Sequence, residues 1–163
     1  MTLIRDATSF DRILADQTAT EAFALELLGL MEARTGLEIV VYLQGQLGAG
    51  KTTLVRGLLR HLGFAGAVKS PTYTLLEPYS SNGLNIYHFD LYRLNSPEEL
   101  EFVGFDEIFS GSGLKLIEWP QKGMGWLPQP NCIIDLEVYS APSEILDQQQ
   151  AEVFQRRVRV SFV

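Results

Sequence analysis

Cysteine and long apolar runs are both scarce in this sequence. Cys132 is the only cysteine among the 163 residues, which excludes an intramolecular disulfide and a Cys-rich zinc site. A reducing compartment suits such a chain, so we expect it in the cytoplasm. Charged residues interrupt the apolar positions of residues 1–16, and no later stretch is long and apolar enough for a bilayer. We therefore expect neither a signal peptide nor a membrane span.

Positive charge is also scarce. The 13 Lys and Arg residues are outnumbered by 20 Asp and Glu residues, which gives a formal net charge of −7. A protein that holds nucleic acid by itself normally presents a concentrated positive field. The one basic cluster contains Arg156, Arg157 and Arg159, which alternate with Val158 and Val160 at the period of a strand. This pattern favours a solvated strand face over a binding patch.

The length and the apolar content predict one compact domain over residues 1–163, because 46% of the residues are hydrophobic. Thr18 and Glu21 have the spacing of a capping box, which predicts the start of a helix that Gly36 ends. The apolar, β-branched run at residues 38–43 is typical of a central strand buried on both faces.

Strand and helix signals continue along the rest of the chain. Asn82 and Gly83 favour the tight turn of a hairpin, and Ser96 and Glu99 have capping-box spacing before a short helix. Residues 141–154 are polar and Gln-rich and predict no element more definite than a loop. Further strands are predicted at residues 10–14, 72–79, 84–90, 114–119, 132–139 and 157–163, the last two antiparallel to each other.

A phosphate-binding loop is the strongest functional signal. Residues 45–52 read GQLGAGKT and fit the pattern G-x-x-x-x-G-K-[ST]. Gly45 lets the chain turn off the preceding strand, and Gly48 and Gly50 let backbone N–H groups converge on a β-phosphate without obstruction by a Cβ. A helical stripe follows and closes at Gly63, so the loop opens a helix. This context favours a functional loop over a Gly-rich turn with an incidental lysine.

Three side chains after the glycines have the chemistry of a nucleotide site. Lys51 supplies a positive charge for the β- and γ-phosphates, Thr52 offers a hydroxyl to magnesium, and Thr53 reaches the α-phosphate. We therefore predict that the chain binds a nucleoside triphosphate, ATP, with Mg²⁺. The predicted fold class is α/β, a P-loop NTPase-like sheet with flanking helices and an antiparallel C-terminal portion in a single domain.

Two acidic residues end predicted strands and are candidates for a second magnesium contact and for positioning water. They are Asp90, after residues 86–89, and Glu118, after residues 114–117. His88 shares a strand face with Asp90, so it either approaches the γ-phosphate or lies in the core with a hydrogen-bond partner. Trp119 packs either on a nucleotide base or on the core.

These motifs together resemble one family. In addition to the phosphate loop, the chain contains VKSPTYTL, YHFDLYR, PEELE and EWP, at residues 68–75, 87–93, 97–101 and 118–120. In this order and at this spacing they are similar to the TsaE family, and the resemblance covers roughly residues 16–127. The phosphate loop alone is unspecific, but its combination with SPTYTL, HFDLYR and EWP is highly specific.

The resemblance implies a bacterial magnesium-dependent ATPase with a compact P-loop α/β fold. Members of the family are needed to make threonylcarbamoyladenosine in tRNAs that read codons beginning with adenosine. They act with the TsaB and TsaD proteins, and their ATP hydrolysis supports repeated turnover of that complex, in which TsaD carries out the transfer. The resemblance therefore implies contact with tRNA only indirectly, through the complex.

The resemblance also assigns roles to residues. It implies a catalytic set of Lys51, Asp90 and Glu118, and a metal set of Thr52, Asp90 and Glu118. The nucleotide-binding set is Thr18, Thr20, Gly45, Gln46, Leu47, Gly48, Ala49, Gly50, Lys51, Thr52, Thr53 and Trp119, with Thr18 and Thr20 beside the adenine. The switch or partner set is Ser70, Thr72, His88, Tyr92 and Arg93.

Gln46 departs from the family, whose members commonly have aspartate at this place. An amide orients water by hydrogen bonds but does not accept its proton at neutral pH, which argues against a general-base role for Gln46. A small-molecule P-loop kinase and a non-hydrolysing nucleotide-sensing module are the alternative functions. A kinase of this size usually needs an Arg-rich lid, and none is evident in the sequence. A GTPase is disfavoured because the Asn-Lys-x-Asp guanine motif does not occur.

The acidic composition predicts weak binding to tRNA. We expect no submicromolar affinity of the purified protein for immobilised tRNA at physiological salt, because the chain offers little positive surface to the phosphate backbone. Submicromolar binding without partner proteins would contradict this expectation.

Overall fold

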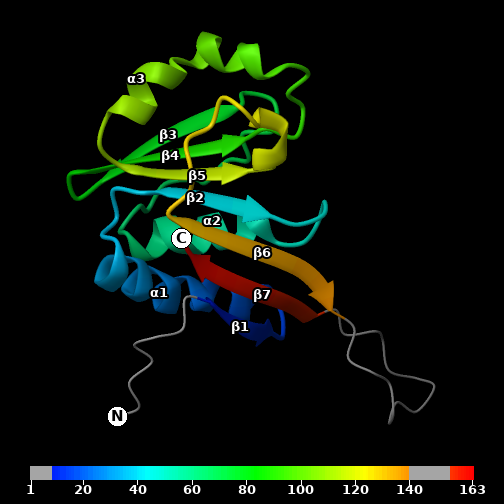
Figure 1. Ribbon diagram of the computed structural model, residues 1–163. Helices are drawn as coiled ribbons and strands as arrows, with labels where there is room; N and C mark the ends of the chain where they lie inside the picture. Colours follow the sequence, from blue (N-terminus) through cyan, green and yellow to red (C-terminus); the bar gives the residue numbers. More distant parts are fainter. Residues whose placement is uncertain (1–8, 140–154) are drawn as a thin grey trace.

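The computed structural model describes residues 9–139 and 155–163. The segment 141–154, for which the sequence predicts at most a loop, lies outside the described residues. Its strands form one sheet of seven in the order β1-β7-β6-β2-β5-β4-β3 (Figure 1). The strands are β1 (Ser9–Leu14), β2 (Val40–Gln44), β3 (Leu76–Ser81), β4 (Leu84–Asp90), β5 (Leu114–Glu118), β6 (Cys132–Tyr139) and β7 (Gln155–Phe162). The helices are α1 (Gln17–Arg34), α2 (Lys51–His61) and α3 (Phe105–Ser110), with 3₁₀ helices η1 (Pro97–Val103) and η2 (Pro120–Gly123).

The sheet is parallel at its centre and antiparallel at its edges. β2 pairs in parallel with β5 and β6, and β4 pairs in parallel with β5. β3 is antiparallel to β4, and β7 is antiparallel to both β6 and β1. This arrangement confirms the predicted α/β class, the predicted hairpin and the antiparallel C-terminal portion.

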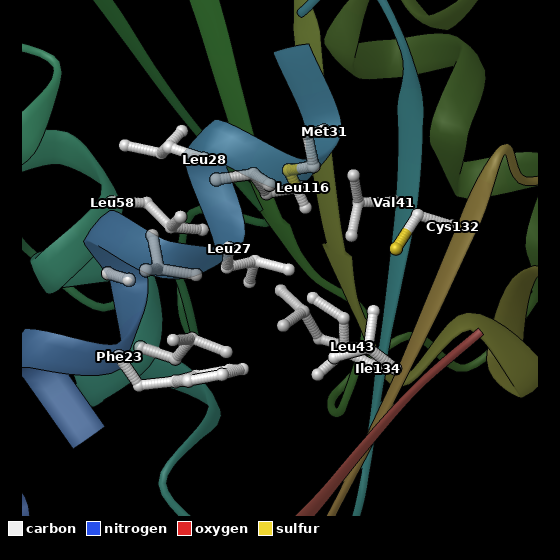
Figure 2. Close-up of a cluster of buried hydrophobic side chains, with 14 of the residues drawn as sticks. Phe23, Leu27, Leu28, Met31, Val41, Leu43, Leu58, Leu116, Cys132 and Ile134 are labelled. Atoms are coloured by element: carbon white, nitrogen blue, oxygen red, sulfur yellow. The ribbon is translucent and has the colours of Figure 1, made fainter. Parts of the chain in front are cut away.

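The two faces of the sheet are covered by different helices. Val41 and Leu43 point into a buried cluster with α1 and α2, where Leu27 and Leu58 pack against them (Figure 2). The alternate residues Val40 and Tyr42 pack against a second cluster, which contains side chains of η1 and α3. Because strand side chains alternate between faces, β2 carries apolar side chains on both, as the sequence predicts for a central strand.

The structure corrects the predicted start of the first helix. α1 begins at Gln17, and the side chain of Asp16 accepts a hydrogen bond from the backbone N–H of Ala19 at 2.7 Å. The capping box predicted at Thr18 is therefore wrong, because Asp16 already satisfies the first turn and leaves Thr18 inside the helix. Among the described residues, no helix combines the length and the apolar character needed to cross a membrane.

The strand predicted to begin at Thr72 begins at Leu76. Residues 72–75 form a turn in which Leu75 has a φ of 63° and donates its N–H to the carbonyl of Pro71 at 2.8 Å. The predicted start of this strand is therefore wrong. The alternating residues of SPTYTL belong to the turn that precedes β3. The sequence also missed α3, whose 6 residues are too few to show a helical period.

Packing of α1 on α2 yields a prediction for two helical glycines. A Cβ on Gly57 of α2 would lie 2.8 Å from the carbonyl oxygen of Glu21 and 2.9 Å from the Cβ of Ala24, whereas a Cβ on Gly29 of α1 would meet nothing within 4 Å. We expect Gly57→Ala to lower the free energy of unfolding by about 1–3 kcal/mol. Gly29→Ala is the matched control and should raise it by about 0.4–1 kcal/mol. Urea unfolding measures the free energy of unfolding of both variants. A Gly57→Ala protein more stable than the unaltered one would contradict the close packing of α1 on α2 at Gly57.

Candidate nucleotide-binding site

The loop between β2 and α2 has a backbone that needs its glycines. Gly45 has a φ of 140°, and a Cβ there would lie 2.3 Å from the carbonyl oxygen of Leu136 on β6. Gly48 and Gly50 have φ angles of 79° and 105°, in the left-handed region that favours glycine. Gly50 directly precedes α2, so the loop leads into a helix N-terminus, where backbone N–H groups lack intrahelical partners.

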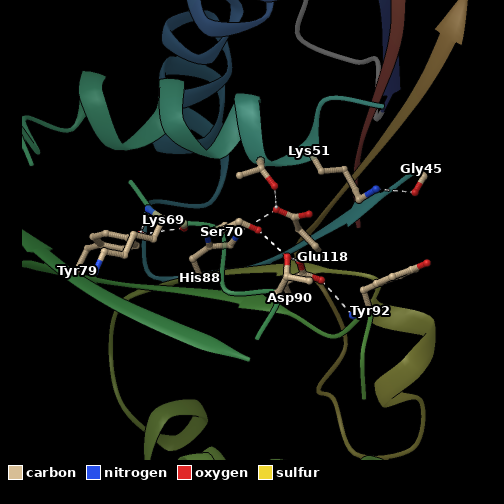
Figure 3. Close-up of polar contacts among 11 residues, drawn as sticks. Gly45, Lys51, Lys69, Ser70, Tyr79, His88, Asp90, Tyr92 and Glu118 are labelled. Atoms are coloured by element: carbon tan, nitrogen blue, oxygen red, sulfur yellow. Dashed lines mark hydrogen bonds and ion pairs between the residues drawn. The ribbon is translucent and has the colours of Figure 1, made fainter. Parts of the chain in front are cut away.

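Lys51 is buried at the first position of α2. The residue is 4% exposed, and its Nζ donates to the carbonyl oxygen of Gly45 at 2.7 Å (Figure 3). The Nζ also donates to the carbonyl oxygen of Gln46 at 2.9 Å. The Nζ also lies 4.4 Å from the ring centroid of Trp119. Burial lowers the pKa of Lys51, and the carboxylates of Glu118 and Asp90 oppose that shift. The ammonium is therefore held by oxygen acceptors and a π face in a place with little water.

Glu118 is the hub of the buried polar contacts. Its Oε1 accepts from the Thr52 hydroxyl at 2.9 Å and contacts Nε2 of His88 at 2.8 Å. Since a carboxylate oxygen accepts, this contact assigns the proton of the imidazole to Nε2. His88 is fully buried, and its Nδ1 has no hydrogen-bond partner within the described part of the chain. The sequence left two roles open for His88, an approach to the γ-phosphate or a place in the core with a hydrogen-bond partner. The structure agrees with the second, in which His88 is a core residue bonded to Glu118.

Asp90 lies beside Glu118 because β4 and β5 are paired in parallel at these two residues. Its Oδ2 accepts from the Thr72 hydroxyl at 2.9 Å, and its Oδ1 accepts from the backbone N–H of Tyr92 at 3.0 Å (Figure 3). The hydroxyls of Thr72 and Ser70 are 2.7 Å apart. Asp90 therefore ties the SPTYTL segment to the end of β4.

A cavity of about 320 Å³ lies at the phosphate loop, and Lys51, Asp90 and Glu118 are on its wall. The sequence-derived residues on its wall are Thr20, Leu47, Gly48, Gly50, Lys51, Thr52, Thr53, Ser70, Thr72, Asp90, Tyr92, Glu118 and Trp119. The cavity brings together the loop, both strand-end carboxylates and the SPTYTL segment.

Several predicted residues lie outside this wall. Thr18 is exposed on α1, whereas Asp16, Gln17 and Thr20 line the cavity, because residues three to four positions apart share a helix face and Thr18 is turned away from it. Ala49 is fully buried beneath the loop in the main core.

Gln46 and Arg93 also lie elsewhere. Gln46 reaches Lys51 only through its backbone carbonyl and lines a separate cavity with Gly45 and residues of β6 and β7. Arg93 stacks on the exposed ring of Tyr73, with its Cζ 4.3 Å from the ring centroid, and donates to the Tyr73 hydroxyl at 3.2 Å. The Tyr92 ring, in contrast, packs 5.0 Å from that of Trp119 at the cavity wall.

Sequence reasoning missed Asp16, Gln17 and Arg156 on the cavity wall. The solvated strand face predicted for the basic cluster holds for Arg157 and Arg159, which pair with exposed carboxylates, but not for Arg156. The alternation of strand residues predicts that Arg156 lies on the opposite face of the strand from Arg157. It does not predict which helix or loop covers that face.

The chemistry of the donors at the loop fits magnesium bound with phosphate. Among the described residues, no group of three or more His, Cys, Asp and Glu side chains is arranged to hold a metal ion. Mg²⁺ needs no such group, because it usually takes one or two carboxylates and fills its other positions with phosphate oxygens and water. The Thr52 hydroxyl, 2.9 Å from Glu118, and the nearby Asp90 offer oxygen ligands of this kind.

Comparison with known proteins identifies the family. A profile of the family described as "Threonylcarbamoyl adenosine biosynthesis protein TsaE" matches residues 14–148. The chain belongs to the TsaE family. The resemblance drawn from the motifs is confirmed, and the match includes the loop, Asp90 and Glu118.

Individual TsaE relatives agree with this assignment. The chain is 53% identical over 110 residues to the tRNA threonylcarbamoyladenosine biosynthesis protein TsaE of Haemophilus influenzae, covering 68% of this chain and 70% of the relative. It is 38% identical over 125 residues to the TsaE protein of Synechocystis, covering 74% of each. The crystal structure of Bacillus subtilis YdiB superposes with a TM-score of 0.68 at 27% identity, over 95% of this chain and 86% of that one.

The buried contact between His88 and Glu118 predicts measurable coupling. A double-mutant cycle with His88→Phe and Glu118→Leu should give a coupling energy of at least about 1 kcal/mol in urea unfolding. Either substitution removes the hydrogen bond and leaves the remaining polar side chain without this partner in the core. The exposed pair Arg12 and Glu26, at 2.6 Å, is the control and should give less than about 1 kcal/mol. Equal coupling in both pairs would contradict the assigned role of His88.

Proposed function

We propose that this chain is a magnesium-dependent ATPase that acts in the threonylcarbamoyladenosine modification of tRNAs reading codons that begin with adenosine. The observation that carries the proposal is the hydrogen bond of the Thr52 hydroxyl to Glu118, next to a buried Lys51, at the head of α2. It joins the two groups expected to bind magnesium beside the charge expected to bind phosphate. Family membership supports the tRNA pathway, which the names of the relatives state.

The residues of the chain divide the chemical work. The N–H groups at the start of α2 and the Lys51 ammonium bind the phosphates and stabilise the charge of the transferring γ-phosphoryl group. Thr52, Glu118 and Asp90 would hold magnesium, which would neutralise part of the phosphate charge. His88 keeps the Glu118 carboxylate in place through the 2.8 Å contact.

Water positioning falls to the carboxylates at the strand ends. Gln46 lies away from the cavity wall and is an amide, whereas Glu118 and Asp90 both line the cavity. Asp90 also connects the site to Ser70 and Thr72 through hydroxyl contacts. These contacts support the proposal that the SPTYTL segment responds to the state of the γ-phosphate, as a switch segment does.

The partners proposed for the chain are TsaB and TsaD, with tRNA reached only through their complex. The net charge of −7 supports this indirect route. Hydrolysis by the isolated protein is expected to be weak and to rise in the complex. We further infer that the chain forms one P-loop domain and works in the cytoplasm.

Removal of the loop lysine tests the proposal. Lys51→Ala should lower the rate of single-turnover ATP hydrolysis by about 100-fold or more, because it removes the charge that offsets the γ-phosphoryl oxygens. Phosphate release is measured with Mg²⁺, in the absence and then in the presence of TsaB and TsaD. Omission of Mg²⁺ should abolish the activity of the unaltered protein.

Lys122→Ala is the matched control, since Lys122 is exposed on η2 and does not line the cavity. It should hydrolyse ATP like the unaltered protein. Phosphate release that persists unchanged in Lys51→Ala would place the active site elsewhere. Transfer of phosphate to a small-molecule acceptor would favour the kinase alternative, and ATP binding without hydrolysis, even with both partners, would favour the sensing module.

A further inference from the structure

The turn at residues 72–75 is attached to the chain that follows β4 at two adjacent residues. Thr72 donates its hydroxyl to Oδ2 of Asp90 at 2.9 Å. Tyr73, the next residue, contacts Arg93. The Nη2 of Arg93 donates to the Tyr73 hydroxyl at 3.2 Å, and its Cζ lies 4.3 Å from the ring centroid. Two attachments fix the orientation of the turn, whereas one would allow it to pivot.

Arg93 extends from a well-anchored part of the chain. It lies in a turn that is closed by a hydrogen bond from the backbone N–H of Leu94 to the carbonyl oxygen of Leu91 at 3.0 Å. Leu91 and Leu94 are both buried and pack in the second cluster. Tyr73, in contrast, is 81% exposed. The fixed partner in this contact is therefore Arg93, and the residue that it holds is Tyr73.

The backbone of the turn at residues 72–75 is strained. Leu75 has a φ of 63°, in the left-handed region that is unfavourable for a bulky side chain. Its N–H donates to the carbonyl oxygen of Pro71 at 2.8 Å, and its side chain packs against the second cluster. A strained backbone persists only where surrounding contacts hold it. The attachments of Thr72 and Tyr73 are among the contacts that do so.

Thr72 connects the Arg93 contact to the cavity. Thr72 and Asp90 are on the cavity wall, whereas Tyr73 and Arg93 lie outside it. The two oxygens of Asp90 accept from different groups, Oδ2 from Thr72 and Oδ1 from the backbone N–H of Tyr92. The position of Thr72 therefore affects how Asp90 is held at the site.

We propose that the contact of Arg93 with Tyr73 is a latch that keeps the turn at residues 72–75 against Asp90, and that Arg93 and Tyr73 are positioning residues for this carboxylate. This inference rests on the proposed function and deepens it, because it identifies what holds the proposed switch segment in place. An exposed cation–π contact suits a latch, since it is weak enough to open and close.

Amide hydrogen exchange of the nucleotide-free protein tests the latch. The N–H of Leu75 is bonded within the turn, so its exchange rate reports how often the turn opens. Arg93→Ala should raise this rate by about two- to fivefold, the size expected for the loss of one exposed cation–π contact. Arg157→Ala is the matched control, because Arg157 lies over the ring of Tyr139 at 4.5 Å, on β7 and β6. It should leave the exchange of Leu75 unchanged.

Conservative variants separate a latch from a general loss of stability. Arg93→Lys keeps a cation for the ring of Tyr73, whereas Arg93→Gln does not. The N–H of Leu75 should therefore exchange more slowly in the lysine variant than in the glutamine variant. Tyr73→Phe keeps the ring, so the same N–H should exchange more slowly in it than in Tyr73→Ala.

Single-turnover ATP hydrolysis with Mg²⁺ tests whether the latch acts through Thr72. Arg93→Ala should lower the rate constant by about two- to fivefold, in proportion to the opening of the turn. The affinity for ATP should stay unchanged, because Arg93 lies outside the cavity wall. In a Thr72→Val background, Arg93→Ala should have no further effect, since the hydroxyl that couples the turn to Asp90 is absent.

Three results would overturn the inference. They are unchanged Leu75 exchange in Arg93→Ala, equal exchange in the lysine and glutamine variants, and an equal loss of hydrolysis rate with and without the Thr72 hydroxyl. If the unaltered protein hydrolysed no ATP, the proposed function would fail, and the exchange measurements would still decide whether the latch exists.

Discussion

The parallel pairing of β2, β5 and β4 is the constraint on which the site depends. Parallel strands end at the same edge of a sheet, so the residues that follow or end them lie together. Here that edge contains Gly45 after β2, Glu118 at the end of β5 and Asp90 at the end of β4. The glycine-rich loop and the two strand-end carboxylates are thus brought together by the pairing of the strands.

The same edge must stabilise several polar groups in a nearly dry environment. Lys51, His88, Asp90 and Glu118 are each at most 4% exposed. Burial of such groups is unfavourable unless hydrogen bonds replace water, and each of them contacts another polar group of the loop, the strands or the SPTYTL segment. The network is therefore a structural requirement of the core, in addition to any role in the proposed function.

Much of the fold could be predicted because the signals are local. The alternation of strand residues, the Asn82 and Gly83 turn and the continuous apolar run of β2 each follow from a few neighbouring residues. The predicted start of α1 was wrong because two side chains could cap the same turn, and Asp16 is the one that bonds Ala19. The helix α3 was not predicted, because its 6 residues are too few to show the periodic apolar pattern of a helix.

The loop between β2 and α2 could be predicted from its residues without the structure. Its glycines, Lys51 and Thr52 are neighbours in the chain, so the pattern that predicts a phosphate-binding loop is a local one. The three-dimensional fold was needed to show that His88 contacts Glu118 and that Gln46 lies away from the cavity. It was also needed to show that Arg156 lies against Gly48, 108 positions earlier. Contacts of this kind depend on strand order and register, which set the faces and edges that meet and which no short pattern encodes.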